Sequence, residues 1–158
     1  MSDERVVEML GRAALESLAE IATTSLGLYA PSVVSSSNSV PTGKQGALVS
    51  LVGQGPATLG LFGTGDSCTA LARSFLGMAP GEAMTREDMV DGVSEIANII
   101  AGGIKRRASL FGSARIGLPV FVMGDVLFLH GVEVSSMELR LGEAALTLSV
   151  IAKVVIYK

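Results

Sequence analysis

The chain has 158 residues, of which 49% are apolar and only 17% charged, and its formal net charge is −3. This length suits a single domain spanning residues 1–158, and the low charge suggests that a partner or a second copy covers part of the surface. The acidic balance argues against nucleic-acid binding, which requires clustered Lys and Arg. No apolar run is long enough for membrane insertion.

Few side chains are candidates for redox or metal chemistry. The sequence begins MSDERVVEML, which lacks the cationic and apolar stretches of a secretory signal, so we expect a cytoplasmic protein. A single cysteine, Cys68, excludes an intrachain disulfide, and we interpret it as a buried structural thiol. With one histidine, His130, far from Cys68 in sequence, we expect no metal site and no cofactor of the protein's own.

The first half of the chain predicts a helix followed by strands. Apolar residues recur at helical spacing from Asp3 to about Ala22. Residues 28–40, LYAPSVVSSSNSV, are β-branched and Ser-rich, which favours an edge strand. Residues 47–63, ALVSLVGQGPATLGLFG, predict a hairpin of two strands around a Gly-Pro turn.

Two further helices are predicted in the middle of the chain. Residues 64–78, TGDSCTALARSFLGM, favour a helix with Asp66 or Ser67 as N-cap and Gly77 at its far end. Residues 85–107 predict a long helix that Thr85 caps, with an acidic first turn and a basic last turn that suit the helix dipole.

The remainder of the chain predicts three longer strands. It alternates and is rich in Val, Ile, Leu and Phe, with breaks at Gly124 to Asp125, Gly131 and Gly142. The whole order therefore indicates an α+β fold, with long helices packed on a mostly antiparallel sheet.

A faint internal repeat links the two long helices. Residues 18–28, LAEIATTSLGL, lie 75 positions before residues 93–103, VSEIANIIAGG. Glu20 then matches Glu95, and Thr23 stands where Asn98 does. Both segments lie on a long helix that precedes strands, so the pattern suggests a pseudo-duplicated helix-plus-strands unit.

The second long helix carries a narrow polar stripe. Each helical residue advances about 100°, so Glu95 lies about 40° round the axis from Asp91. On the same count, Asn98 and Gly102 lie at about −20° and 20°. These four residues are called the ridge below. The opposite side is apolar and comprises Met89, Val93, Ile96, Ile100 and Ile104.

Most polar stripes on amphipathic helices are solvated surface only. The ridge differs because it lacks Lys and Arg, and because Asn, Gly102 and Gly103 are poor residues for a helix interior. Small residues beside a short amide would let another backbone approach closely. A binding surface is therefore one interpretation and a solvent-facing stripe in a structural module is another.

The ridge also carries a family resemblance. DGVSEIANIIAGGIKRR followed by IGLP resembles the signature of the CheC/CheX/FliY family of bacterial chemotaxis phosphatases: Asp or Ser, then Glu, Asn and a downstream Pro. Here these are Asp91, Glu95, Asn98 and Pro119. The predicted hairpin and the helix ending in Leu-Gly-Met are also similar, so the resemblance covers roughly residues 43–130.

Only one of the two helical copies has the complete motif, as in CheX-like members of the family. The first copy has Thr23 in place of the Asn, and Glu16 rather than Asp or Ser before Glu20. We therefore expect no catalysis at the first helix.

The resemblance implies a phosphatase that acts on the aspartyl-phosphate of a phosphorylated CheY-type response regulator. Asn98 would orient the attacking water, and Glu95 would pair with a regulator lysine. Asp91 and Gly102 would contact the partner, and Mg²⁺ would belong to the regulator. The resemblance also implies a homodimer. The alternative is a CheX-like module that binds a receiver domain or a flagellar component without catalysis.

Overall fold

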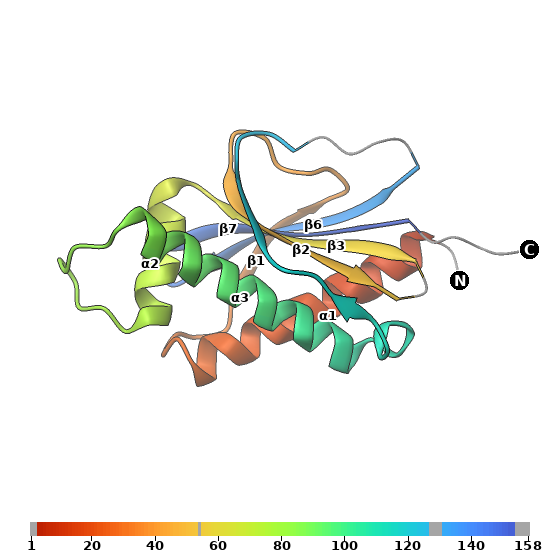
Figure 1. Ribbon diagram of the computed structural model, residues 1–158, viewed down its shortest axis with the longest axis horizontal. Helices are drawn as coiled ribbons and strands as arrows, with labels where there is room; N and C mark the ends of the chain where they lie inside the picture. Colours follow the sequence, from red (N-terminus) through yellow and green to blue (C-terminus); the bar gives the residue numbers. More distant parts are fainter. Residues whose placement is uncertain (1–2, 54, 127–130, 154–158) are drawn as a thin grey trace, which may run out of the picture.

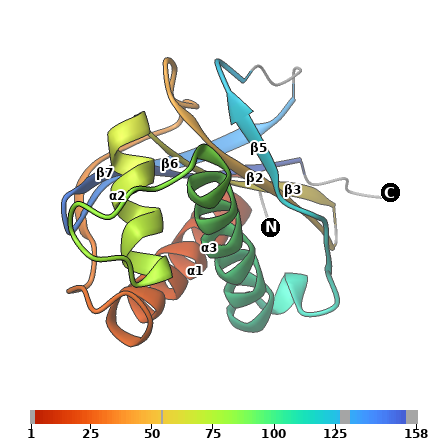
Figure 2. The ribbon, with the colours of Figure 1, turned by 60° about the vertical axis from the view of Figure 1, so that its left-hand side comes forward.

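The computed structural model describes residues 3–53, 55–126 and 131–153. Three helices lie on one face of a seven-stranded sheet (Figures 1 and 2), which confirms the predicted α+β fold. The helices are α1 (Asp3–Thr24), α2 (Gly65–Leu76) and α3 (Arg86–Arg107), with a short 3-10 turn, η1 (Ser109–Phe111). The strands are β1 (Ser32–Ser37), β2 (Gln45–Val52), β3 (Pro56–Gly63), β4 (Arg115–Ile116), β5 (Val120–Met123), β6 (Glu133–Leu141) and β7 (Ala144–Ala152).

All paired strands of the sheet are antiparallel, in the order β1-β6-β7-β3-β2-β4, and β5 also pairs with β2. The predicted edge strand is β1, and the predicted hairpin is β2–β3. On the opposite edge, β4 and β5 run along β2 as one interrupted strand. The backbone N–H of Gly117 donates to the carbonyl of Ser50 (2.8 Å) between them.

The topology agrees with the predicted repeat of a helix-plus-strands unit. Each half of the chain supplies a long helix, an edge strand and a hairpin: α1, β1 and β2–β3 in the first half, then α3, β4–β5 and β6–β7 in the second. The edge strand of each half pairs with the hairpin of the other half, and the hairpins meet where β3 pairs with β7. Helix α1 packs on β6 and β7, while α3 packs on β2 and β3.

The core lies between the three helices and the inner face of the sheet. Strand side chains such as Leu59, Leu61 and Leu148 are fully buried there. The predicted apolar side of α3 faces the same core. Its five members, each at most 7% exposed, are Met89, Val93, Ile96, Ile100 and Ile104.

Two local predictions were wrong. The N-cap of α2 is Thr64, not Asp66 or Ser67, because the backbone is still extended at Thr64, whose hydroxyl accepts from the Ser67 N–H (3.2 Å). In place of three longer strands, the described residues form two short strands, β4 and β5, and two long ones, β6 and β7. Pro119, which has no N–H for the ladder, lies in the interruption between β4 and β5.

Other predicted boundaries are confirmed. Gly77 ends α2 in the left-handed conformation (φ 66°), and Gly142 forms the turn between β6 and β7 (φ 58°). Thr85 caps α3 by accepting from the Asp88 N–H (3.1 Å). His130, the only histidine in the sequence, falls on residues 127–130, which lie outside the described residues.

Candidate functional site

The ridge lies on the outer face of α3. The other sides of α3 pack against α1, α2 and strands β2 to β5 (Figure 2). Asp91 and Glu95 are exposed, while Asn98 and Gly102 are partly exposed. Among the residues that the structure describes, none forms a hydrogen bond or ion pair with the side chains of Asp91, Glu95 or Asn98. An acid and an amide are thus presented together, on a packed helix, to whatever approaches from outside.

Two glycines set how closely α3 approaches its neighbours. A Cβ built on Gly92 would lie 2.9 Å from Ala72 Cβ of α2, and one built on Gly103 would lie 2.6 Å from Ser17 Cβ of α1. Gly103 therefore serves packing inside the molecule. Gly102 fits a binding surface better, because the atom nearest to a Cβ built there is Nη1 of Arg106, at 3.7 Å.

The first copy of the motif has partners within the chain. Nη2 of Arg107 donates to a Glu20 carboxylate oxygen, and this hydrogen bond, together with the charge of Arg107, lowers the pKa of Glu20. The Thr23 hydroxyl donates to the carbonyls of Ala19 and Glu20 (both 3.2 Å). Sequence analysis interpreted Arg107 only as a favourable charge at a helix end. It did not predict this pairing.

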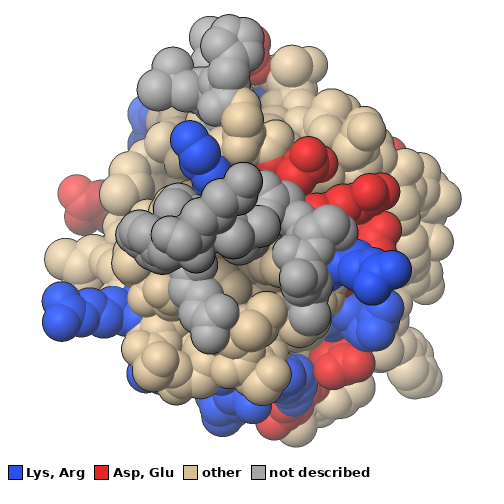
Figure 3. Space-filling model, turned by 90° about the vertical axis from the view of Figure 1, so that its right-hand side faces the viewer, with Lys and Arg blue, Asp and Glu red and all other residues tan. Residues whose placement is uncertain are grey.

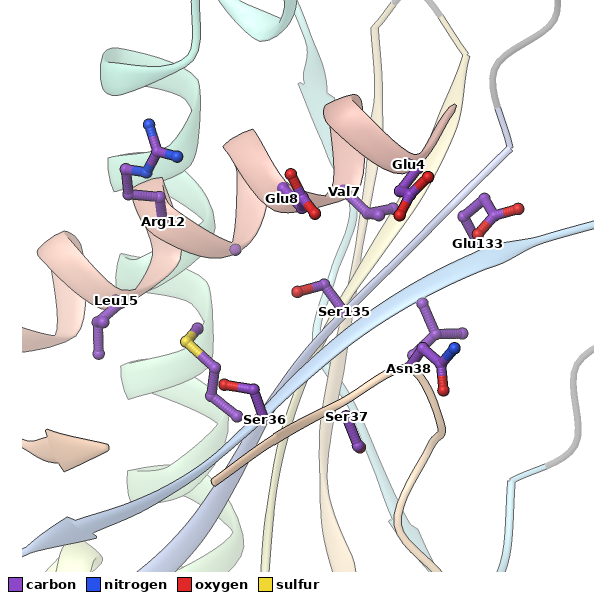
Figure 4. Close-up of a pocket in the computed structure, with 13 residues that line it drawn as sticks. Glu4, Val7, Glu8, Arg12, Leu15, Ser36, Ser37, Asn38, Glu133 and Ser135 are labelled. Atoms are coloured by element: carbon purple, nitrogen blue, oxygen red, sulfur yellow. The ribbon is translucent and has the colours of Figure 1, made fainter. Parts of the chain in front are cut away.

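Three cavities lined by described residues lie away from the ridge. One of about 600 Å³ separates α1 from the edge of the sheet at β1 and β6. Glu4, Glu8 and Arg12 follow one another along its helical wall, with Ser36 and Ser135 on the strand side (Figure 4). None of the ridge residues lines this cavity or the two smaller ones, of about 390 and 320 Å³.

Comparison with protein families decides the identity of the chain. Residues 45–134, more than half of the sequence, match the family described as chemotaxis phosphatase CheX. The chain belongs to the CheX family. The match contains α3 with its ridge and Pro119. A search of curated proteins found no match.

Solved structures share the CheX fold with this chain. A CheX from Desulfovibrio desulfuricans has 17% identity and a TM-score of 0.77, covering 91% of this chain and 99% of its own. A CheX from Vibrio vulnificus has 22% identity and a TM-score of 0.68, covering 89% and 95%. A CheX–CheY–BeF3–Mg²⁺ complex from Borrelia burgdorferi has 17% identity and a TM-score of 0.70, covering 89% and 95%.

The edge of the sheet beside α3 exposes an apolar surface that sequence analysis missed. Leu118 is 89% exposed, and Val120 and Met123 are each 57% exposed. They belong to the segment GLPVFVM, which also contains Pro119 of the CheX-like motif. An apolar run with Gly and Pro at its start was the available signal, because Pro favours an edge over a central strand.

Other parts of this CheX-family structure offer little for chemistry. Cys68 is buried, as interpreted from the sequence, and this burial raises the pKa of its thiol to about 11. Within residues 3–53, 55–126 and 131–153, no three His, Cys, Asp or Glu side chains group as metal ligands. No helix in the same segments is long and apolar enough to cross a membrane. Basic and acidic side chains lie beside one another on the face shown in Figure 3.

Proposed function

We propose that this protein accelerates hydrolysis of the aspartyl-phosphate of a CheY-type response regulator, using the ridge of α3. The observation that carries the proposal is the pair Glu95 and Asn98, presented outward without a partner among the described residues on a helix of a CheX-family chain. A relative, the CheX of Borrelia burgdorferi, forms a complex with CheY, BeF3 and Mg²⁺. This supports a receiver domain as the partner.

Asn98 has the chemistry to position the nucleophile. An acyl phosphate is already reactive, so catalysis consists mainly of alignment and charge stabilisation. The Asn98 amide accepts a hydrogen bond from a water and donates another to the phosphoryl region. As the water oxygen bonds to phosphorus, the bond from phosphorus to the regulator's aspartate oxygen breaks, leaving a carboxylate and inorganic phosphate.

Glu95 has the complementary task of fixing the approach. Its exposed carboxylate pairs with a lysine of the regulator near the phosphoryl group, and this contact sets the direction from which Asn98 enters. Asp91, one turn earlier, and Gly102, one turn after Asn98, contact the partner at the two ends of the ridge. Gly102 lets the partner's backbone come close, because a Cβ built there would meet only Nη1 of the Arg106 side chain, at 3.7 Å. The Mg²⁺ belongs to the regulator.

The deciding experiment measures phosphate release from a purified regulator loaded with a small phosphodonor. Release should be faster with this protein than without it, and Asn98→Ala should abolish the acceleration. The matched control is Thr23→Ala, which alters the position equivalent to Asn98 in the first copy and should leave the rate nearly unchanged. If Asn98→Ala retains the wild-type rate, the water-orienting role is wrong. If wild type binds the receiver but gives no acceleration, the protein is a binding module.

We also propose a homodimer. Leu118, Val120 and Met123 expose apolar surface on a sheet edge, and such edges are usually covered in native proteins. Light scattering at micromolar concentration should report twice the mass of the 16.2 kDa chain. A monomer would contradict the proposal.

A further inference from the structure

Arg107, the last residue of α3, reaches across to α1 through three contacts. Its Nη1 donates to the Ser17 hydroxyl (3.0 Å), its Nη2 donates to Glu20, and its Nε lies 3.8 Å from a Glu16 carboxylate oxygen. Ser17 is only 2% exposed, so the guanidinium spans from the solvent-facing acids to a buried hydroxyl. Arg107, Glu16, Ser17, Glu20 and Gly103 are called the latch below.

The acids of the latch occupy the ridge positions of the first copy. The 75-residue offset of the repeat carries Glu16 onto Asp91 and Glu20 onto Glu95. In the first copy these acids hold a cation of the chain itself. In the second copy they meet no cation among the described residues. Because Glu16 and Glu20 already pair with Arg107, they are unavailable to a cation of another protein.

The latch lies at one of two points where a glycine of α3 packs closely against another helix. Gly92 meets Ala72 of α2 just after Asp91, and Gly103 meets Ser17 just after Gly102. The two glycines are 11 positions apart, which turns the helix by about 1100°, so both lie on one flank, about 16 Å apart. The ridge, which extends from Asp91 to Gly102, therefore has a close-packed contact at each end.

We propose that the latch positions the ridge. The first copy of the motif, on α1, supports α3 and sets the distance and rotation of α3 relative to α1. The inference rests on the proposed function. Arg107 and Gly103 are positioning residues, since they act through α3. Catalysis by alignment is sensitive to such support, because a misplacement of about 1 Å can cost about 100-fold in rate.

Variants of the latch should change kcat more than KM. At a temperature where every variant is folded, Arg107→Met and Gly103→Ala should each lower kcat at least about tenfold at saturating regulator. Adding Ser17→Gly to Gly103→Ala removes the two Ser17 atoms that the new methyl meets, so it should restore part of the lost kcat, although the hydrogen bond from Arg107 to Ser17 is lost. The matched control is Arg12→Met, which removes the same kind of exposed charge from α1 outside the latch.

The second readout is independent of activity. In ¹⁵N-labelled protein, Arg107→Met and Gly103→Ala should shift the side-chain amide resonances of Asn98, whereas Arg12→Met should not. If Arg107→Met leaves both kcat and these resonances unchanged, whatever its melting temperature, the latch only stabilises the fold and the proposal is overturned. If wild type shows no phosphatase activity, the proposed function fails, and the Asn98 resonances alone decide whether the latch positions the ridge.

Discussion

Asn98→Ala should lower activity without lowering stability. The Asn98 side chain is partly exposed and has no hydrogen-bond partner among the described residues. Its truncation breaks no hydrogen bond among the described residues, and alanine forms helix better than asparagine by roughly 0.5 kcal/mol. The free energy of unfolding should therefore change by no more than about 0.5 kcal/mol. For 158 residues the unfolding entropy is about 0.3 kcal/mol/K, so the melting temperature should move by about 2 °C at most.

The comparison variant is Leu148→Ala on β7, whose side chain lies in the core between the sheet and the helices. Leu148 is fully buried between Leu61 and Met137 of the neighbouring strands, and Leu→Ala in a core costs about 2–5 kcal/mol. Its melting temperature should fall by about 6–15 °C on the same entropy, while the folded protein stays active at 20 °C.

Circular-dichroism melts and phosphate release at 20 °C measure the two quantities separately. We expect Asn98→Ala to be stable and inactive, and Leu148→Ala to be less stable and active. An Asn98→Ala protein destabilised by more than about 2 kcal/mol would show that the amide supports the fold, because exposed positions outside structural features rarely cost that much. The argument that places Asn98 at the reacting phosphoryl group would then lose its basis.

Three further predictions concern titratable groups. Because an amide does not ionise, stimulated dephosphorylation should be nearly flat from about pH 6 to pH 8 once the regulator's own hydrolysis is subtracted, and a steep titration there would indicate another catalytic group. Cys68, with its pKa raised to about 11 by burial, should resist iodoacetamide at pH 8 in the native protein and react quickly in urea; rapid native alkylation would contradict its packing. Arg107 lowers the pKa of Glu20, so their pairing should stabilise the fold above the unfolded value of 4.5 and be lost as pH falls through the folded value. Arg107→Met should remove that part of the acid sensitivity of the melting temperature, and an unchanged acid limb would count against the pairing.

The parts of the fold that sequence predicted are those fixed by local periodicity. Ile96, Ile100 and Ile104 recur at helical spacing, so the buried side of α3 and the outward ridge both followed from one pattern. The cap of α2 did not, because Thr64, Asp66 and Ser67 can all cap and only the backbone conformation decides among them.

The parts that sequence did not predict depend on which elements meet in space. Gly103 and Gly102 are adjacent and chemically identical, yet Gly103 packs on Ser17, whereas a Cβ on Gly102 would meet only the Arg106 side chain, at 3.7 Å. The contact of Arg107 with Ser17 joins residues 90 positions apart, and no local pattern in either helix indicates it. The repeat suggested that the two helices are related. It did not show that the last residue of one would bind the acids of the other.

The two copies of the motif differ in the pairing of their glutamates: Glu20 binds Arg107, whereas Glu95 has no cation partner among the described residues. An exposed carboxylate is well solvated, so leaving Glu95 unpaired costs the folded state little, and surface ion pairs gain only about 0–1 kcal/mol. Stability therefore gives no strong reason for Glu20 to have an arginine and Glu95 none. The difference has a functional reason in the proposed mechanism. An acid already held by the chain's own Arg107 is closed to a regulator lysine, whereas Glu95 stays open to one and has beside it the amide that the first copy lacks.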